Sequence, residues 1–356
     1  MLTALLLAPV AMSAQQASGP TLEAITFNVW HGLRSGESNK RFPGEDEERK
    51  ERRLAWQIEE LKRLDPDLLF FQEVNPNQPL AGWYAGELGY DEIHKVTSCG
   101  LHLGGIYKIP KNMNEGIAIL AKPELGLRRV GKKRLSGNAT CSATWGFQTK
   151  ESRYALFGEI TVNGRKVLVT TAHLFSAPFV LPTFEDDLEQ LVEQGVLEPE
   201  QRDEILAARD TKVARATGEA KLLLQEIEKR RARLGPDAPV ILGGDFNAEP
   251  DAPGIAVIKA AGFLEAGTGP DFRTWDPVTN EVNYGIGTRR HDPLPTFDKP
   301  EVQELLAHRS TTPRQIDHIF VSADFEVLSA EMVLNQDKDG MYPSDHFGIL
   351  AVLQLR

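Results

Sequence analysis

Histidines, carboxylates and side-chain amides stand beside the ends of several apolar segments that predict β-strands. The residues in these positions are Asn28, Glu73, His173, Asp245 with Asn247, Asp317, and Asp345 with His346. Strand ends are where protein scaffolds present functional groups on short loops. The repeated coincidence therefore predicts one site to which several strand ends contribute.

Each of these motifs also has a purely structural explanation when it is taken alone. Gly244-Asp245-Phe246-Asn247 is typical of a turn in which the carboxylate and amide bond nearby backbone N–H groups. Gln72-Glu73 suits a solvated strand edge, and Ser344-Asp345-His346 suits a helix N-cap or a core histidine. The functional interpretation therefore rests on the set rather than on any single member.

The combined set has the composition of a site for a hard divalent cation and a phosphate group. Mg²⁺ prefers oxygen ligands and is typically held by one or two carboxylates together with substrate phosphate oxygens. Oxygen ligands are supplied by Asn28, Glu73, Asp245, Asn247 and Asp345. His173 and His346 are side chains able to exchange protons near neutral pH.

The elements that must position these residues alternate between strands, a hairpin and helices. Apolar runs predict strands at 22–29 and 67–71, separated by a helix over 46–64 that Asp65-Pro66 ends. Strands at 154–162 and 165–172 flank Asn163-Gly164, a pair typical of a type I′ hairpin turn.

The remaining elements follow the same pattern. Further strands are expected at 115–121, 240–242, 316–321 and 349–355, and residues 184–233 are expected to be helical in at least two pieces, broken near Gly195 and Pro199. Strands joined both by a hairpin and by helices indicate an α+β fold with a largely antiparallel sheet system covered by helices.

Composition favours one soluble globular domain. The chain has 356 residues, of which 41% are hydrophobic and 26% are charged, and no Gly/Ser-rich or Pro-rich linker divides it. The net charge is −11, and nine acidic residues against one arginine fall within residues 183–204. Because nucleic acids are bound largely through Lys and Arg, this balance weakens a nuclease interpretation without excluding it.

The first 20 residues predict a signal peptide, and hence a secreted or periplasmic protein. Residues 2–10 form an apolar run too short to cross a bilayer, and no charged residue precedes Glu23. No other stretch approaches membrane-spanning length. Cys99 and Cys141 are the only cysteines, which is compatible with one disulfide in an exported protein or with two buried thiols.

Seven motifs in order resemble the endonuclease/exonuclease/phosphatase superfamily, which includes deoxyribonucleases, neutral sphingomyelinases and inositol-polyphosphate phosphatases. They are TFNVW (26–30), PDLLFFQEV (66–74), NEGIAIL (114–120), TTAHL (170–174), ILGGDFNAEP (241–250), RQIDHIFVS (314–322) and YPSDHFGIL (342–350). The resemblance implies a four-layer α/β/β/α sandwich over residues 21–356, with a helical insertion near 180–208.

The resemblance also implies a role for each motif residue. Glu73, helped by Asn28, is expected to be the principal metal ligand, and Asp345 to complete the metal-facing set. Asp245 and Asn247 are expected to orient the attacking water and contact the phosphate, with a second metal as an option. Asp317 is expected to orient His346.

The resemblance implies roles for two further residues, each of which also has a plausible purely structural explanation. Glu115 is expected to orient His173, but it also suits an ion pair with Lys111. Arg153 stands where some relatives place a phosphate-binding arginine, but it also suits the capping of a sheet edge. Which histidine acts as base and which as acid stays open.

The function expected from these residues is a divalent-metal-dependent hydrolase of phosphate esters, most simply a phosphodiesterase, acting as a monomer. Mg²⁺ is the expected cofactor, with Mn²⁺ or Ca²⁺ as alternatives. A small molecule or a lipid headgroup is the favoured substrate; a secreted nuclease and a non-catalytic binding module are the alternatives. Arg289, Arg290 and His291 offer a basic loop for a second anionic group, or simply a solvated loop.

Overall fold

The structure is a computed structural model, and it describes residues 19, 21–32, 45–103, 107–109, 113–141, 145–177, 183–235, 237–280, 282, 299–307 and 312–356. The predicted signal peptide and the basic loop with Arg289, Arg290 and His291 lie outside the described residues, except for Gly19. Both therefore stay predictions.

Two six-stranded sheets form the body of the protein. The first has the order β15 (Phe325–Val333), β16 (Gly348–Leu355), β1 (Thr21–Asn28), β2 (Leu68–Val74), β6 (Glu115–Ala121) and β3 (Asp91–Ser98). The second has the order β13 (Leu264–Ala266), β14 (Asp317–Val321), β12 (Val240–Asp245), β11 (Arg165–His173), β10 (Arg153–Val162) and β7 (Arg128–Ser136). Each sheet has one parallel pair, β1 with β2 and β11 with β12, and antiparallel pairs otherwise.

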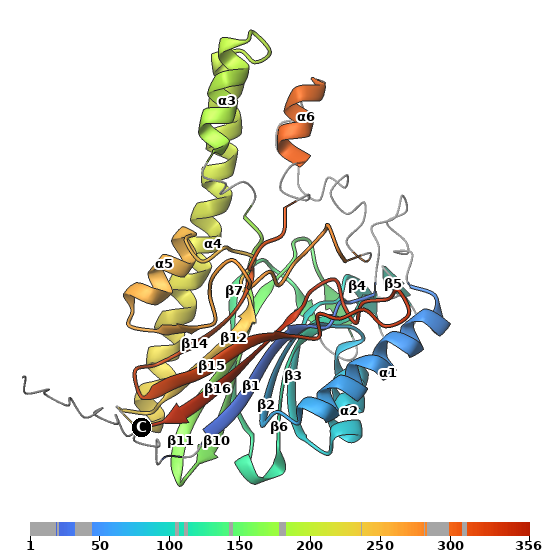
Figure 1. The fold of residues 1–356 in the computed structure, drawn as a ribbon, viewed down its shortest axis with the longest axis vertical. Coiled ribbons are helices and arrows are strands. Elements are labelled where there is room, and N and C mark those ends of the chain that lie inside the picture. Colours follow the sequence, from blue (N-terminus) through green and yellow to red (C-terminus); the bar gives the residue numbers. More distant parts are fainter. Residues whose placement is uncertain are drawn as a thin grey trace, which may run out of the picture.

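The sheets pack face to face and helices cover both outer faces (Figure 1). The central core joins residues of the first sheet, such as Phe70, to residues of the second, such as Leu156 and Ile241. A second core lies beneath α1 (Glu47–Leu64) and α2 (Asn77–Leu88), and a third beneath α4 (Pro199–Leu234) and α5 (Pro253–Ala260). The predicted four-layer α+β sandwich is therefore confirmed.

Local sequence signals account for the hairpin and for the first helix. Asn163 and Gly164 both have positive φ, 50° and 77°, as a type I′ turn requires, and Val162 pairs with Arg165 across it. The Asp46 side chain caps α1 by accepting from the Arg49 N–H, and Asp65 ends the helix in a left-handed conformation.

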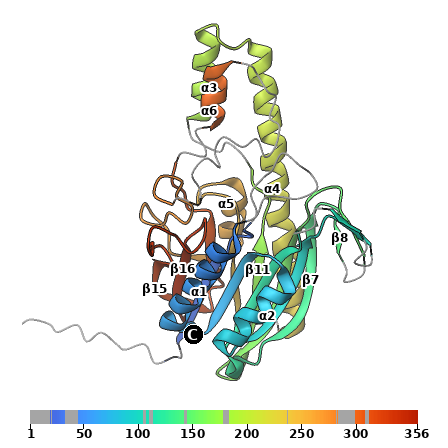
Figure 2. The same cartoon turned by 90° about the vertical axis from the view of Figure 1, so that its right-hand side faces the viewer.

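Three helices form an arm that projects beyond the sandwich, as both cartoon views show (Figures 1 and 2). They are α3 (Phe184–Glu193), the N-terminal part of α4 and α6 (Pro300–Ala307). Phe184 and Leu188 of α3 pack with Ile205 of α4 and Val302 of α6, so the arm has a small core of its own. None of the described helices is long and apolar enough to span a membrane.

A small third sheet stands beside the first. It has the order β5 (Tyr107–Ile109), β4 (Leu101–Leu103), β9 (Trp145–Phe147) and β8 (Thr140–Cys141). Elsewhere, a 3₁₀ turn at Pro123–Leu125 connects β6 to β7. Cys99, just before β4, and Cys141, in β8, are joined by a disulfide with their Cα atoms 5.9 Å apart. The question that the sequence left open between a disulfide and two thiols is settled in favour of the disulfide.

Candidate active site

Glu73 points into the site because β2 bulges at its end. The pairing of β2 with β6 shifts register between Phe71 and Val74, and Glu73 takes a positive φ of 57°. A bulge re-aims a side chain that regular pleating would place elsewhere, and a left-handed conformation at a non-glycine residue is strained. The carboxylate accepts the backbone N–H of His31 at 3.2 Å.

Asp245 ends β12 in the turn that its sequence predicts, and the turn leaves one carboxylate oxygen for the site. Its Oδ1 accepts the Asn247 N–H at 2.8 Å, and Asn247 adopts a φ of 51°. Its Oδ2 accepts from Asn28 Nδ2 at 3.0 Å. The turn that the sequence predicts is therefore present, and the functional roles of Asp245 and Asn247 stay predictions.

His346 is held in one orientation by a buried carboxylate from the neighbouring sheet. Its Nδ1 lies 2.8 Å from Asp317 Oδ2, and its Nε2 lies 3.5 Å from Asn28 Nδ2 and 3.9 Å from Asp245 Oδ2. Because Nδ1 is engaged by Asp317, Nε2 is the ring nitrogen that faces the other site residues.

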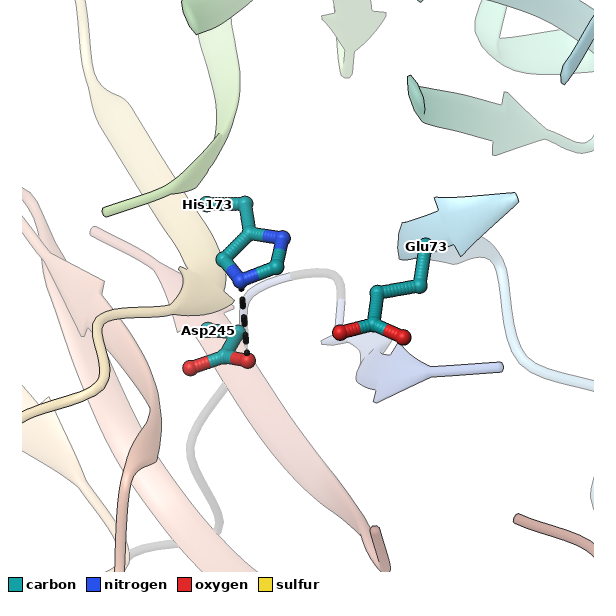
Figure 3. Close-up of side chains that lie close together, drawn as sticks. All are labelled: Glu73, His173 and Asp245. Atoms are coloured by element: carbon teal, nitrogen blue, oxygen red, sulfur yellow. Dashed lines mark ion pairs between the residues drawn. The ribbon is translucent and has the colours of Figure 1, made fainter. Parts of the chain in front are cut away.

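Two overlapping clusters of ligand-type atoms result, and Asp245 belongs to both. Glu73, His173 and Asp245 form the first, in which His173 Nε2 lies 3.4 Å from Asp245 Oδ2 (Figure 3). Asp245, Asp317 and His346 form the second. Within each cluster the ligand atoms all lie within 4.8 Å of one another, so these buried groups resemble a metal site.

Several carboxylates lie close together in the site, and their mutual repulsion favours the binding of a cation. Burial and the nearby Asp317 carboxylate raise the pKa of Asp245 to about 7. Burial raises the pKa of Asp345 to about 6, although the charge on His346 opposes the shift. Such shifts mean that carboxylates are costly to ionise where they stand, and a divalent cation would remove that cost. The oxygen-rich donor set therefore fits a hard divalent cation.

The two histidines differ in charge state. Burial opposes protonation of His346, but the Asp317 carboxylate outweighs it and holds the pKa of His346 well above the usual value. Burial and the positive charge of Arg153 push the pKa of His173 well below the usual value. In the metal-free protein, His346 is therefore protonated at neutral pH and His173 is neutral.

Glu115 and Arg153 are both brought to the site. Burial and the charge of Glu73 raise the pKa of Glu115 to about 8. Arg153 pairs with Glu151 at 3.1 Å. Within the described part of the chain, Glu115 makes no hydrogen bond to His173, and the alternative partner Lys111 lies outside it. The roles expected for Glu115 and Arg153 stay predictions.

Several contributors carried no recognisable sequence signal. His31 follows Asn28 by three residues, and its Nε2 lies 3.5 Å from Glu73 Oε2. Thr274 Oγ1 accepts the N–H groups of Ile316 and Asp317 at 3.0 and 3.1 Å. Asn280 donates to the Ser344 carbonyl at 2.8 Å. The segment around Thr274 and Asn280 therefore supports the backbone that carries Asp317 and the Ser344 loop before His346.

Helix α1 fixes the same loops from the other side of the sheet. Arg53 Nη1 donates to the Val29 carbonyl at 2.9 Å, and Gln57 donates to the Pro343 carbonyl. Tyr84 of α2 donates in turn to Gln57, and Arg53 forms a buried ion pair with Glu45 at 3.0 Å. Residues that look like a solvated charged helix in sequence thus position the ends of β1 and the Ser344 loop.

Gly244 is required where β12 approaches β11 just before Asp245. A Cβ at this position would lie 2.1 Å from the Ala172 carbonyl oxygen, a backbone atom that cannot move aside. We expect Gly244→Ala to lower the free energy of unfolding by about 3 kcal/mol, measured by urea denaturation, because the paired backbones must separate. The matched control is Gly218→Ala in α4, where nothing lies within 4 Å and alanine should be neutral or stabilising. Equal effects of the two changes would contradict this account.

A four-layer sandwich with buried carboxylates, amides and a carboxylate-held histidine at its strand ends defines a phosphoesterase-type fold and site. The sequence profile described as the endonuclease/exonuclease/phosphatase family matches residues 25–346. The chain therefore belongs to the endonuclease/exonuclease/phosphatase family, as its motifs predicted. No curated protein sequence matches the chain significantly.

Solved structures share the fold at low identity. A family protein from Bacteroides thetaiotaomicron matches at a TM-score of 0.56 and 16% identity, over 95% of this chain and 99% of that one. A mannosyl-6-phosphatase from the same species matches at 0.55 and 17%, over 93% and 99%. TDP2 from D. rerio, in complex with a single-strand DNA product, matches at 0.50 and 17%, over 94% and 99%.

Proposed function

We propose that the protein is a Mg²⁺-dependent hydrolase of phosphate esters, acting as a phosphodiesterase on a small molecule or a lipid headgroup. The observation that carries the proposal is the convergence of Glu73, Asp245 and the Asp317-held His346 at the ends of strands from both sheets. These are the residue types needed to hold a hard cation, place a water and supply a proton.

The chain's residues divide the work as follows. Glu73, Asp345 and the amide of Asn28 would hold the cation, which when bound polarises a phosphate oxygen and offsets the charge that builds during in-line attack. Asp245 and Asn247 orient the attacking water. His346, fixed by Asp317, presents Nε2 to the phosphate and donates a proton from its charged form.

The charge of the arm supports a small or lipid-borne substrate over a nucleic acid. The Phe175 N–H donates to Glu219 in the middle of α4, so the part of α4 before Glu219 extends past the strand end that carries His173. Helix α3, which packs on that extension, carries five acidic residues, including Glu185, Asp186 and Asp187, and no Lys or Arg. Acidic groups on the arm would repel a long polyanion that extended from the site along it.

The direct test compares four substrates with the purified chain in Mg²⁺ or Mn²⁺: bis(4-nitrophenyl) phosphate, 4-nitrophenyl phosphate, sphingomyelin and plasmid DNA. We expect metal-dependent turnover of the diester that EDTA abolishes, that Asp245→Asn removes, and that Asp186→Asn on the exposed arm leaves unchanged. Faster turnover of DNA than of the small diester and sphingomyelin would favour the nuclease alternative. No metal-dependent turnover of any of the four would overturn the enzyme proposal.

A further inference from the structure

A pocket adjoins the site beside Asn247 and none of the expected catalytic roles uses it. Apolar side chains, including Leu174, Phe246 and Ile316, line one part of it. The remaining walls come from α4 around Ala216 and from the first turn of α5. Asn247 belongs to both the pocket and the phosphate site, so a group held here would lie next to the reacting phosphate.

Among the described residues that line this pocket, Arg314 is the only Lys or Arg. Its guanidinium lies over the Trp275 ring, 4.7 Å from the ring centroid. The backbones of the same two residues bridge through hydrogen bonds of 3.0 and 2.9 Å, so the arginine is fixed at both ends. A preorganised planar guanidinium loses little entropy when it binds an oxyanion.

The guanidinium has no acceptor for its donors within the described part of the chain. Its Nε is buried and has no hydrogen-bond partner. Glu249 also lines the pocket and Asp245 lies beyond it, and both oppose the lowering of the Arg314 pKa by burial. A desolvated cation that lacks a direct partner gains strongly from a ligand that supplies one.

The first turn of α5, which lines the same pocket, adds backbone donors. The N-cap of α5 is Ala252, whose side chain makes no capping hydrogen bond, and Pro253 follows at the first helical position. The N–H groups of Gly254 and Ile255 precede the first helical bond, which runs from Ala256 to the Ala252 carbonyl. Free N–H groups and the helix dipole favour an anion at such an end.

We propose that this pocket binds a second oxyanion of the substrate, a phosphate or a carboxylate, joined to the scissile phosphate ester by a short apolar linker. Arg314 binds the oxyanion from one side and the first turn of α5 from the other, while the apolar walls contact the linker. The inference rests on the proposed function only in placing the reacting phosphate at Asp245 and Asn247. It gives Arg314 a role of the kind for which the sequence offered Arg289, Arg290 and His291, whose own role stays a prediction.

The test measures binding rather than turnover. Calorimetric titration of the full chain with Mg²⁺ present compares 3-hydroxypropyl phosphate, propane-1,3-diol bisphosphate and 4-phosphonooxybutanoate. We expect the bisphosphate or the carboxylate compound to bind at least about tenfold more tightly than the monophosphate, since a charged hydrogen-bonded pair contributes on this scale. The tighter of the two identifies the second group.

Two variants and one control assign the preference to the pocket. Arg314→Gln removes the charge, and Ala216→Phe fills the pocket from α4 while leaving Arg314 in place; each should reduce the preference to about twofold or less. Arg128→Gln removes an exposed charge that pairs with Glu159 on the second sheet, and it should preserve the preference. Thermal melts show whether each variant is folded. If Arg314→Gln does not fold, the binding preference of Ala216→Phe tests the pocket by itself.

The possible results separate the two proposals. An absent preference in the wild type, or an unchanged one in both variants, overturns the pocket proposal. An equal loss of affinity for the monophosphate in Arg314→Gln also overturns it, because Arg314 would then bind the reacting phosphate. A pocket-dependent preference in a protein that hydrolyses no phosphate ester leaves the pocket standing and overturns the proposed function.

Discussion

Replacing His346 with alanine is expected to slow hydrolysis of an alkyl phosphodiester by about 10³-fold, since general acid catalysis and stabilisation of developing charge each contribute on the order of 10²-fold or more. The protonated ring is ready to donate because Asp317 holds Nδ1 at 2.8 Å and raises the pKa of His346. The measurement is kcat/KM for paired diesters that differ only in the pKa of the leaving alcohol.

The leaving group gives this prediction its control. 4-Nitrophenolate departs with little need of a proton, so His346→Ala should cost far less with bis(4-nitrophenyl) phosphate than with the alkyl ester. Asp317→Asn should reproduce most of the loss, and the double variant should be no slower than His346→Ala, because both residues serve one proton transfer. A loss that is the same for both leaving groups would exclude His346 as the acid.

The residues of the candidate site could be named from the sequence because each is tied to a local pattern. Asp245 and Asn247 stand in a turn whose geometry their side chains favour, and that turn follows a continuous apolar strand. Asn28 and Glu73 end neighbouring strands. Such signals place a residue within its element, but they do not say which element lies opposite.

Residues that support the site only through tertiary contacts could not be predicted from local sequence patterns. Thr274 supports Asp317 from 43 residues away, and Gln57 reaches the Pro343 carbonyl from 286 residues away. Arg314 lies inside a motif that predicted only Asp317. The role proposed for Arg314 depends on its contact with Trp275 and on the first turn of α5, which lines the same pocket. No periodicity or composition of a single segment encodes such pairs.

Charge crowding links the site's architecture to its dependence on pH. In the metal-free protein, burial and Glu73 hold the pKa of Glu115 near 8, and burial and Asp317 hold that of Asp245 near 7. Their ordinary values are 4.5 and 3.8, so over the intervening pH range the folded chain retains protons that the unfolded chain has lost. The stabilisation is complete below the unfolded-state values and is lost as pH rises through 7 and 8.

We therefore expect the free energy of unfolding of the metal-free protein to fall between pH 6.5 and 8.5, by about 2 kcal/mol, since one proton linked to unfolding contributes about 1.4 kcal/mol per pH unit. The raised pKa of His346 acts in the same direction. His173 has a lowered pKa and acts in the opposite direction, but only below about pH 6.5, where its unfolded form gains a proton. Urea denaturation in EDTA measures the slope. Glu115→Gln should make it shallower, whereas Asp186→Asn should not.

A divalent cation reverses this dependence, because it binds the carboxylates only in their ionised form. The apparent dissociation constant for Mg²⁺ or Mn²⁺ is expected to fall by about 100-fold from pH 6 to pH 8, or roughly tenfold per pH unit for each proton displaced. Calorimetry in two buffers of different ionisation enthalpy counts the protons released on binding. We expect between one and two, from Asp245 and its carboxylate neighbours. An affinity independent of pH, with no proton release, would place the cation away from Asp345 and its neighbour Asp245 and would remove the electrostatic basis for the site.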